Sequence, residues 1–203
     1  VNPGHIVVKS ACGKFTFENQ NCFAGDAENT FTVETGVNLV FKNQPSETLI
    51  PWTLIVAGDI SMQSSTAAGT GNGWYGPIQL NGTLTFNGNG NASAARFDGK
   101  ITGTGGITFA SGVFKMTGSN NASKTNEYAG VTLVKNGATL TVESMALVPA
   151  DHGRLVAEGG AHVVYSSSPE KDMTATAERA MDANMSVTTN SAYNIETTDV
   201  VIN

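Results

Sequence analysis

Two short stretches contain residue types that catalysis or nucleotide binding could use. Asp151 and His152 form an adjacent acid–imidazole pair, but neighbouring residues of a strand point to opposite faces, so we interpret them as a turn after Pro149. The run 71–76 fits the G-x-G-x-x-G pattern, yet Pro77 and a strand-like sequence follow it, where a dinucleotide site needs a helix. We therefore expect no catalytic residue, no cofactor and no bound metal, and we predict that the protein is not an enzyme.

Aromatic side chains are the next candidates, because flat rings stack on the apolar faces of sugars. Trp74 and Tyr75 lie inside the glycine-rich run, which predicts an exposed aromatic loop and makes both residues candidate glycan contacts. Trp52 lies between Pro51 and a Leu-Ile-Val run and is predicted to be in the core. Four sequons would mark surface loops in a glycosylating host, and they begin at Asn81, Asn91, Asn121 and Asn184.

The cysteines, Cys12 and Cys22, are ten positions apart in a segment rich in Asn and Gln. We predict a local disulfide between them, which requires an oxidising compartment. The alternatives are two unrelated thiols or a bridge between subunits. No histidine has ligand spacing relative to either cysteine, so this pair does not indicate a zinc site.

The composition limits the function classes. Charged residues make up 14% of the chain, against about a quarter in ordinary globular proteins, whereas Gly, Asn, Thr and Ser supply 81 of the 203 residues. A formal net charge of −6 argues against a basic face that binds nucleic acid. No apolar run approaches the ~20 residues of a membrane-spanning helix, so we expect no membrane span. Because the chain begins at Val1, we interpret it as a mature, exported form whose leader has been removed.

Apolar and polar residues alternate in short runs punctuated by Gly and Asn, which is typical of half-buried strands. The pairs that carry the pattern are Phe15/Phe17, Phe31/Val33, Leu39/Phe41, Leu84/Phe86, Ile107/Phe109, Phe114/Met116, Val131/Leu133 and Leu140/Val142. The continuous run 54–56 favours a strand covered on both faces. The segment 168–184 is interpreted as either a short helix or a loop: Ser168 could cap a helix, Pro169 fits its first turn, and Met173, Ala177, Ala180 and Met181 would share a face, but that face is thin in apolar groups. These patterns predict one β-rich domain over 1–203.

Glycines recur at an almost constant interval, which is the mark of a repeat architecture. Their spacings are 22, 24, 24, 24 and 23 residues, and an apolar residue follows each of them by one or two positions: Gly36, Gly58, Gly82, Gly106, Gly130 and Gly153. One rung of a parallel β-solenoid has about this length. We therefore favour a parallel β-solenoid with at most one short helix. An antiparallel β-sandwich or barrel is the alternative.

Residues 97–142 resemble a known repeat. The stretch contains Phe97-Asp98-Gly99-Lys100-Ile101, then Gly112-Val113-Phe114-Lys115-Met116, then Tyr128-Ala129-Gly130-Val131 and Gly137-Ala138-Thr139-Leu140. It is similar to the autotransporter-associated β-strand repeat of bacterial surface proteins, although Phe114 and Met116 stand where that family has leucines. The resemblance implies a parallel β-helix that is exported and displayed outside the cell.

The overall profile is also similar, more loosely, to self-polymerising envelope proteins such as the amyloid-like sheaths of filamentous methanogenic archaea. The segment 194–203 ends on Val200, Val201 and Ile202, a strand that could complete the sheet of another copy or pair within its own fold. We expect a non-catalytic, extracellular protein of the microbial cell surface that assembles with copies of itself. An adhesin or carbohydrate-binding module that contacts surface glycans is the alternative, and a polysaccharide-active enzyme is disfavoured because Asp59, Arg96, Asp98 and Lys100 form no clustered run.

Overall fold

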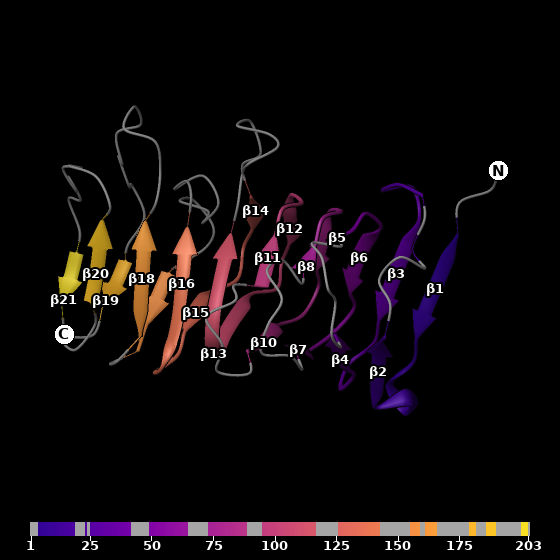
Figure 1. Ribbon diagram of the computed structural model, residues 1–203, viewed down its shortest axis with the longest axis horizontal. Coiled ribbons are helices and arrows are strands. Elements are labelled where there is room, and N and C mark those ends of the chain that lie inside the picture. The colour runs from indigo at the N-terminus through magenta and orange to yellow at the C-terminus, as the bar shows by residue number, and fades with distance from the viewer. Residues whose placement is uncertain are drawn as a thin grey trace.

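All strand pairings in the computed structural model are parallel, and the chain winds as the predicted β-solenoid (Figure 1). The structure describes residues 4–18, 23, 25–41, 49–64, 73–88, 95–116, 126–142, 155–158, 161–165, 179–181, 186–189 and 200–202. The strands lie side by side along the long axis, with β1 and β21 at opposite ends of the stack. The rungs contribute strands to up to three faces, which we call sheets A, B and C, and sheet A ends at β14 while sheets B and C continue to β21 and β20.

Sheet A consists of β1 (His5–Val8), β3 (Thr30–Val33), β6 (Thr53–Val56), β9 (Ile78–Leu80), β12 (Ile101–Gly103) and β14 (Glu127–Tyr128). Sheet B consists of β2 (Lys14–Phe17), β4 (Asn38–Phe41), β7 (Ile60–Ser64), β10 (Leu84–Asn87), the first half of β13 (Ile107–Met116), β15 (Thr132–Val134), β17 (Leu155–Ala157), β19 (Arg179–Met181) and β21 (Val200–Ile202).

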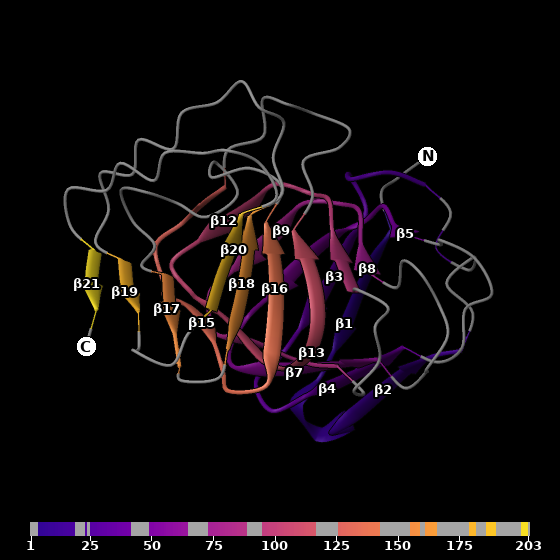
Figure 2. The ribbon, with the colours of Figure 1, turned by 60° about the vertical axis from the view of Figure 1, so that its left-hand side comes forward.

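Sheet C consists of β5 (Leu49–Ile50), β8 (Gly73–Trp74), β11 (Ala95–Phe97), the second half of β13, β16 (Ala138–Val142), β18 (His162–Tyr165) and β20 (Ser186–Thr189). Figure 2 shows β13, β16, β18 and β20 side by side. Sheets B and C join through β13, which turns at Gly112, a residue with φ of 93°. A single 3-10 turn, η1 (Ser10–Cys12), links β1 to β2.

Inward side chains form columns, because each strand pairs in register with the next rung. Leu84 pairs with Ile60 and Ile107, and Phe86 pairs with Met62 and Phe109. All six side chains are buried while the intervening residues are not, which confirms the predicted alternation in β10 and β13. In β6, however, Ile55 is only half-buried between buried Leu54 and Val56, so this strand has one open face rather than the two covered faces we expected.

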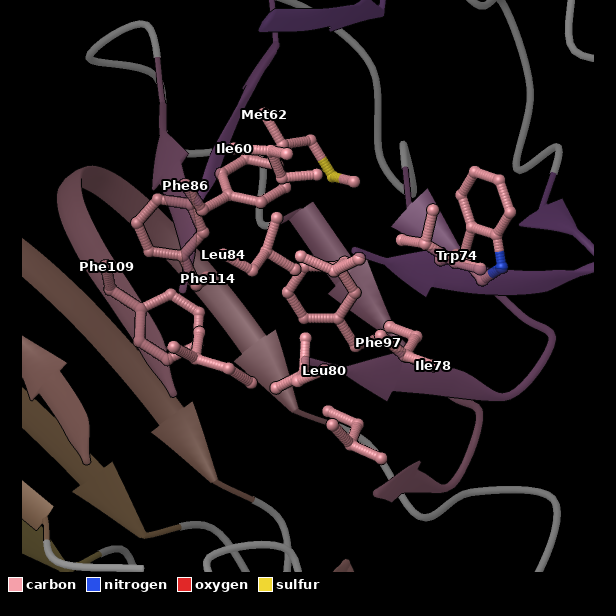
Figure 3. Packing of buried hydrophobic residues seen from close by; sticks show 14 of the residues in the cluster. Ile60, Met62, Trp74, Ile78, Leu80, Leu84, Phe86, Phe97, Phe109 and Phe114 are labelled. Atoms are coloured by element: carbon pink, nitrogen blue, oxygen red, sulfur yellow. The ribbon is translucent and has the colours of Figure 1, made fainter. Parts of the chain in front are cut away.

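Aromatic rings fill the core at two levels. Near the N-terminal end, Phe17 and Phe41 stack with centroids 4.7 Å apart and an interplanar angle of 6°. In the middle rungs, Phe114 contacts Phe86 at 4.8 Å and Phe109 at 4.9 Å, and Figure 3 shows these rings converging with Leu84 and Phe97. Burying each such side chain contributes about 1.5–3 kcal/mol to folding, so these columns account for much of the driving force.

Glycines stack on one another at the corner between sheets A and B. A Cβ built on Gly82 would lie 2.6 Å from the Cα of Gly58, and one built on Gly105 would lie 2.9 Å from the N of Gly82. Gly130 packs in turn on Gly105 and Gly106, and Gly58 packs on Thr35. A glycine period therefore does build the rungs, because the backbones approach too closely here for a side chain.

The stack corrects the repeat that the sequence indicated. Its members are Thr35, Gly58, Gly82, Gly105 and Gly130, so Thr35 and Gly105 take the places given to Gly36 and Gly106. The residue two positions later is always buried: Val37, Ile60, Leu84, Ile107 and Thr132. Val131 is consequently 44% exposed and Leu133 half-buried, and the inward pair of β15 is Thr132 and Val134 rather than Val131 and Leu133. Gly153 lies outside the described residues.

Thr132 needs a polar partner, because it is fully buried. Tyr128, also fully buried, provides it through a hydrogen bond between the two hydroxyl groups. Tyr128 pairs with Gly103, where the earlier strands of sheet A place Val33, Val56 and Leu80. The large side chain of Tyr128 thus stacks on a residue without a side chain, and its hydroxyl satisfies the buried hydroxyl of Thr132 in the neighbouring sheet.

The helix predicted within 168–184 is wrong where it can be compared. Residues Arg179–Met181 form β19, which pairs in parallel with β17 and β21. The rest of that segment lies outside the described residues. The helical pattern assigns Ala180 and Met181 to one face of a helix. In the structure both residues belong to a strand that is hydrogen-bonded to a neighbour on each side, and this pairing overrides a weak helical pattern.

The glycine stack predicts a position-specific cost of adding one methyl group. Gly82→Ala should lower the free energy of unfolding by about 1–3 kcal/mol, because the new Cβ forces the rung away from Gly58. Asn81→Ala, at the exposed neighbouring position, should change it by less than about 0.5 kcal/mol. Urea unfolding followed by circular dichroism measures both free energies of unfolding. Equal midpoints for the two variants would show that the stack does not restrict the residue at position 82.

Candidate assembly edges and surface residues

The N-terminal strands have a neighbour on one side within the described residues. β1 pairs with β3, and β2 pairs with β4. The inward side chains of these strands are less covered than in later rungs: Ile6 and Phe15 are half-buried although both pack on the core. On the outer face of β1, Val7 is 49% exposed. This end of the solenoid therefore presents both backbone groups and apolar surface.

The hydrogen-bond register shows which backbone groups lie at this edge. The N–H groups of Thr30 and Glu34 donate to the carbonyls of Gly4 and Val8, at 3.0 Å each. Alternate residues of a parallel strand face the same neighbour, so the N–H and C=O of Val7 point to the other side of β1. In β2, Asn38 donates to the carbonyl of Gly13, which by the same rule turns Thr16 towards the open edge.

A carboxylate holds the corner between β1 and β2 onto the next rung. Glu34 accepts hydrogen bonds from Lys9 Nζ at 2.8 Å and from the backbone N–H of Ser10 at 3.0 Å. The Lys9 hydrogen bond and then the Ser10 hydrogen bond lower the pKa of Glu34 below its ordinary value. The contact is on the surface, so its role is to fix this corner rather than to stabilise the whole fold.

The described part of the predicted assembly segment 194–203 is a strand. Val200–Ile202 forms β21, and Val200, Val201 and Ile202 pair with Arg179, Ala180 and Met181 of β19. β21 is the last strand of sheet B, so its opposite side has no strand neighbour within the described residues. The segment thus belongs to its own fold on one side, and a contact with another copy on the other side remains a prediction.

The predicted aromatic loop is wrong for Trp74. This residue lies in β8, is fully buried, and donates from Nε1 to the carbonyl of Trp52 at 2.6 Å. Its ring packs against Phe31 at 5.8 Å (the indole is labelled in Figure 3). Tyr75, the next residue, is 36% exposed. Trp52, expected in the core, is half-buried and packs at its boundary. The pair Trp74/Tyr75 cannot form a two-ring platform for a sugar.

Cys12 is an exposed free thiol in η1, and it donates to the carbonyl of Lys14 at 3.2 Å. The structure therefore does not support the predicted Cys12–Cys22 disulfide, although Cys22 itself lies outside the described residues. Asp151 and His152 also lie outside them.

The charged residues named in the sequence do not gather at one site. Asp59 accepts from the N–H of Thr83 at 2.7 Å, and Lys100 pairs with Glu127 at 2.6 Å. Asp98 is buried, and Arg96 stands in register with Lys115. Within the described residues there is no group of three His, Cys, Asp or Glu side chains arranged to hold a metal ion. The same part of the chain contains no helix that is long and apolar enough to cross a membrane.

Sequence reasoning missed the polar side chains that link consecutive rungs. Asn29 and Asn126 each stand just before a strand of sheet A, and their Oδ1 atoms accept from Gly4 at 2.6 Å and Ile101 at 2.8 Å. Glu158 accepts from the N–H of Asn136 at 3.3 Å at another corner. A spacing of about one rung between an Asn and the start of the preceding strand could have indicated this role.

Comparison of the chain with protein-family models, curated proteins and solved structures found no match.

The Glu34 contact predicts a local dependence on pH. Because its folded pKa is lowered, its contribution is present at neutral pH and is lost as the pH falls below about 4.3 and through the folded value. Amide exchange in residues 4–18, measured by mass spectrometry and corrected for intrinsic rates, should increase in this range. Glu34→Gln should remove the pH dependence, whereas Glu28→Gln should keep it. A retained dependence in Glu34→Gln would assign it to another group.

Proposed function

We propose that this protein is a non-catalytic structural protein of the microbial cell surface, and that copies of it assemble through strand edges. The observation that carries the proposal is the parallel ladder of sheet B, in which β2 and β21 are the first and last strands. Both strands run in the same direction and each has one strand neighbour within the described residues. A ladder of this kind can continue into a second copy without a change of pairing.

The geometry favours an open-ended assembly. Contact between β21 of one copy and β2 of the next joins two different surfaces, and a repeated head-to-tail contact produces a filament unless its rotation closes a ring. The columns support such a junction. By strand register alone, Ile202 is aligned with Phe15 through Leu39, Met62, Phe86 and Phe109. The half-buried ring of Phe15 would gain a neighbour.

The composition supports the same proposal. Charged residues, at 14% of the chain, offer little repulsion between like copies or protection of an edge. Extracellular display is part of the proposal, and it accords with the resemblance to the autotransporter-associated repeat. Trp74 is buried in the core, which removes the main support for the carbohydrate-binding alternative. Tyr75 alone could offer a sugar only a single ring.

Prolines at the open edge test the proposal. In Val7→Pro/Thr16→Pro, both substitutions remove N–H groups that face away from β3 and β4, so the fold should survive while the edge loses donors. We expect the double variant to remain a dispersed particle in negative-stain electron microscopy under conditions where the natural chain forms filaments or sheets. Deletion of residues 198–203 should have the same effect at the other end.

Val7→Ala/Thr16→Ala is the matched control, because it changes the same side chains and keeps the backbone donors. It should assemble like the natural chain. Circular dichroism must show the same strand content in all variants. Assembly of the proline variant at the natural rate would rule out these edges, and a natural chain that stays dispersed at every concentration would rule out the proposed function.

A further inference from the structure

The corners between sheets A and B allow a residue-by-residue comparison of five rungs. Each corner consists of an outer residue, a stacked residue, a linking residue and a buried residue. The five corners are Glu34-Thr35-Gly36-Val37, Ala57-Gly58-Asp59-Ile60, Asn81-Gly82-Thr83-Leu84, Thr104-Gly105-Gly106-Ile107 and Ala129-Gly130-Val131-Thr132. Packing restricts the second and fourth positions. The first and third positions vary in size and polarity from rung to rung, and only at some corners do they make specific contacts: Glu34 and Asp59 accept hydrogen bonds, and Gly106 lies against the backbone of Val131.

One corner contains a sequence motif at its two variable positions, the first and the third. Asn81 and Thr83 make Asn81-Gly82-Thr83 an N-x-Thr sequon, whose acceptor is the Asn amide and whose second requirement is the hydroxyl two residues later. Gly82 is explained by the stack, and Leu84 by the core. Neither requirement explains Asn81 or Thr83.

The structure presents this corner as an acceptor would need it. Asn81 is exposed, and the equivalent residues of the two adjacent rungs, Ala57 and Thr104, are small and exposed. The backbone is fixed, because the N–H of Asn81 donates to Val56 at 2.8 Å and the N–H of Thr83 donates to Asp59 Oδ1 at 2.7 Å. A bulky group on Asn81 would therefore extend into solvent without disturbing the core. The other sequons, at Asn91, Asn121 and Asn184, have acceptors outside the described residues.

We propose that Asn81 is an N-glycosylation site and that its donor is a glycan linked to a polyprenyl phosphate or diphosphate. In the transfer, Asn81 Nδ2 forms a bond to the anomeric carbon of the sugar. The bond from that carbon to the phosphate oxygen breaks, the lipid phosphate leaves with the electron pair, and a base takes one amide proton. No oxidant or reductant is required. The proposal rests on the export that the proposed function includes, because such donors face the compartment through which exported chains pass.

Peptide mass spectrometry of the protein from its source cells tests the site. We expect the peptide that contains Asn81 to carry one or more sugar residues. Asn81→Gln and Thr83→Ala, expressed in the same cells, should lose this modification completely, and Thr83→Ser should retain it because the hydroxyl remains. Thr104→Asn places an exposed Asn at the equivalent corner with Gly106 two residues later, so it should add no glycan.

The outcomes separate this site from the proposed function. An unmodified Asn81 peptide in the natural protein, or a sugar retained in Thr83→Ala, overturns the site. Unfolding midpoints within the range of surface substitutions show that loss of sugar in a variant does not come from misfolding. Cell fractionation and electron microscopy of the same material report on export and assembly. A glycosylated protein that never assembles would support the glycosylation site at Asn81 and contradict the proposed assembly into filaments.

Discussion

The close approach of backbones at the corner between sheets A and B is the constraint on which the rest of the solenoid depends. Hydrogen bonding fixes the distance between consecutive strands at about 4.8 Å, and at this corner no Cβ fits between Gly58, Gly82 and Gly105. Because the stacked residue is fixed, the residue two positions later must point inward in every rung. The corner therefore sets the register of sheet B, and the register determines which side chains share a column.

The column that begins at Val37 shows how strong this constraint is. The column continues through Ile60, Leu84 and Ile107. In the next rung a threonine, Thr132, occupies the same position, although apolar Val131 is adjacent to it in the sequence. If the register of this rung shifted by one residue, Val131 would be buried. The stack would then hold a residue with a side chain at the place where Gly130 has none. The chain instead buries the hydroxyl of Thr132 and satisfies it with Tyr128. Backbone contact thus outweighs side-chain hydrophobicity at this rung.

The same reasoning explains what could be predicted from the sequence. Alternation identified the strands around Phe86 and Phe109, because one open face leaves a period of two in the residues themselves. The interval between glycines gave the rung length, but it could not distinguish Gly105 from Gly106, since only contact between rungs shows which one is stacked. Trp74 was misplaced because its glycine neighbours indicate a loop, whereas the burial of its ring depends on Phe31, 43 positions earlier. Helical spacing at Ala180 likewise carried no information about the strand beside it.

Acidic side chains at three corners help to hold consecutive rungs together. Glu34, Asp59 and Glu158 each accept a hydrogen bond from a backbone N–H of an adjacent rung. A carboxylate used in this way satisfies a donor that a corner would otherwise leave unpaired. Because these carboxylates link rungs to one another, the surfaces left for a partner are the backbone ladder at the end strands and the outer residues of the corners, among them exposed Asn81.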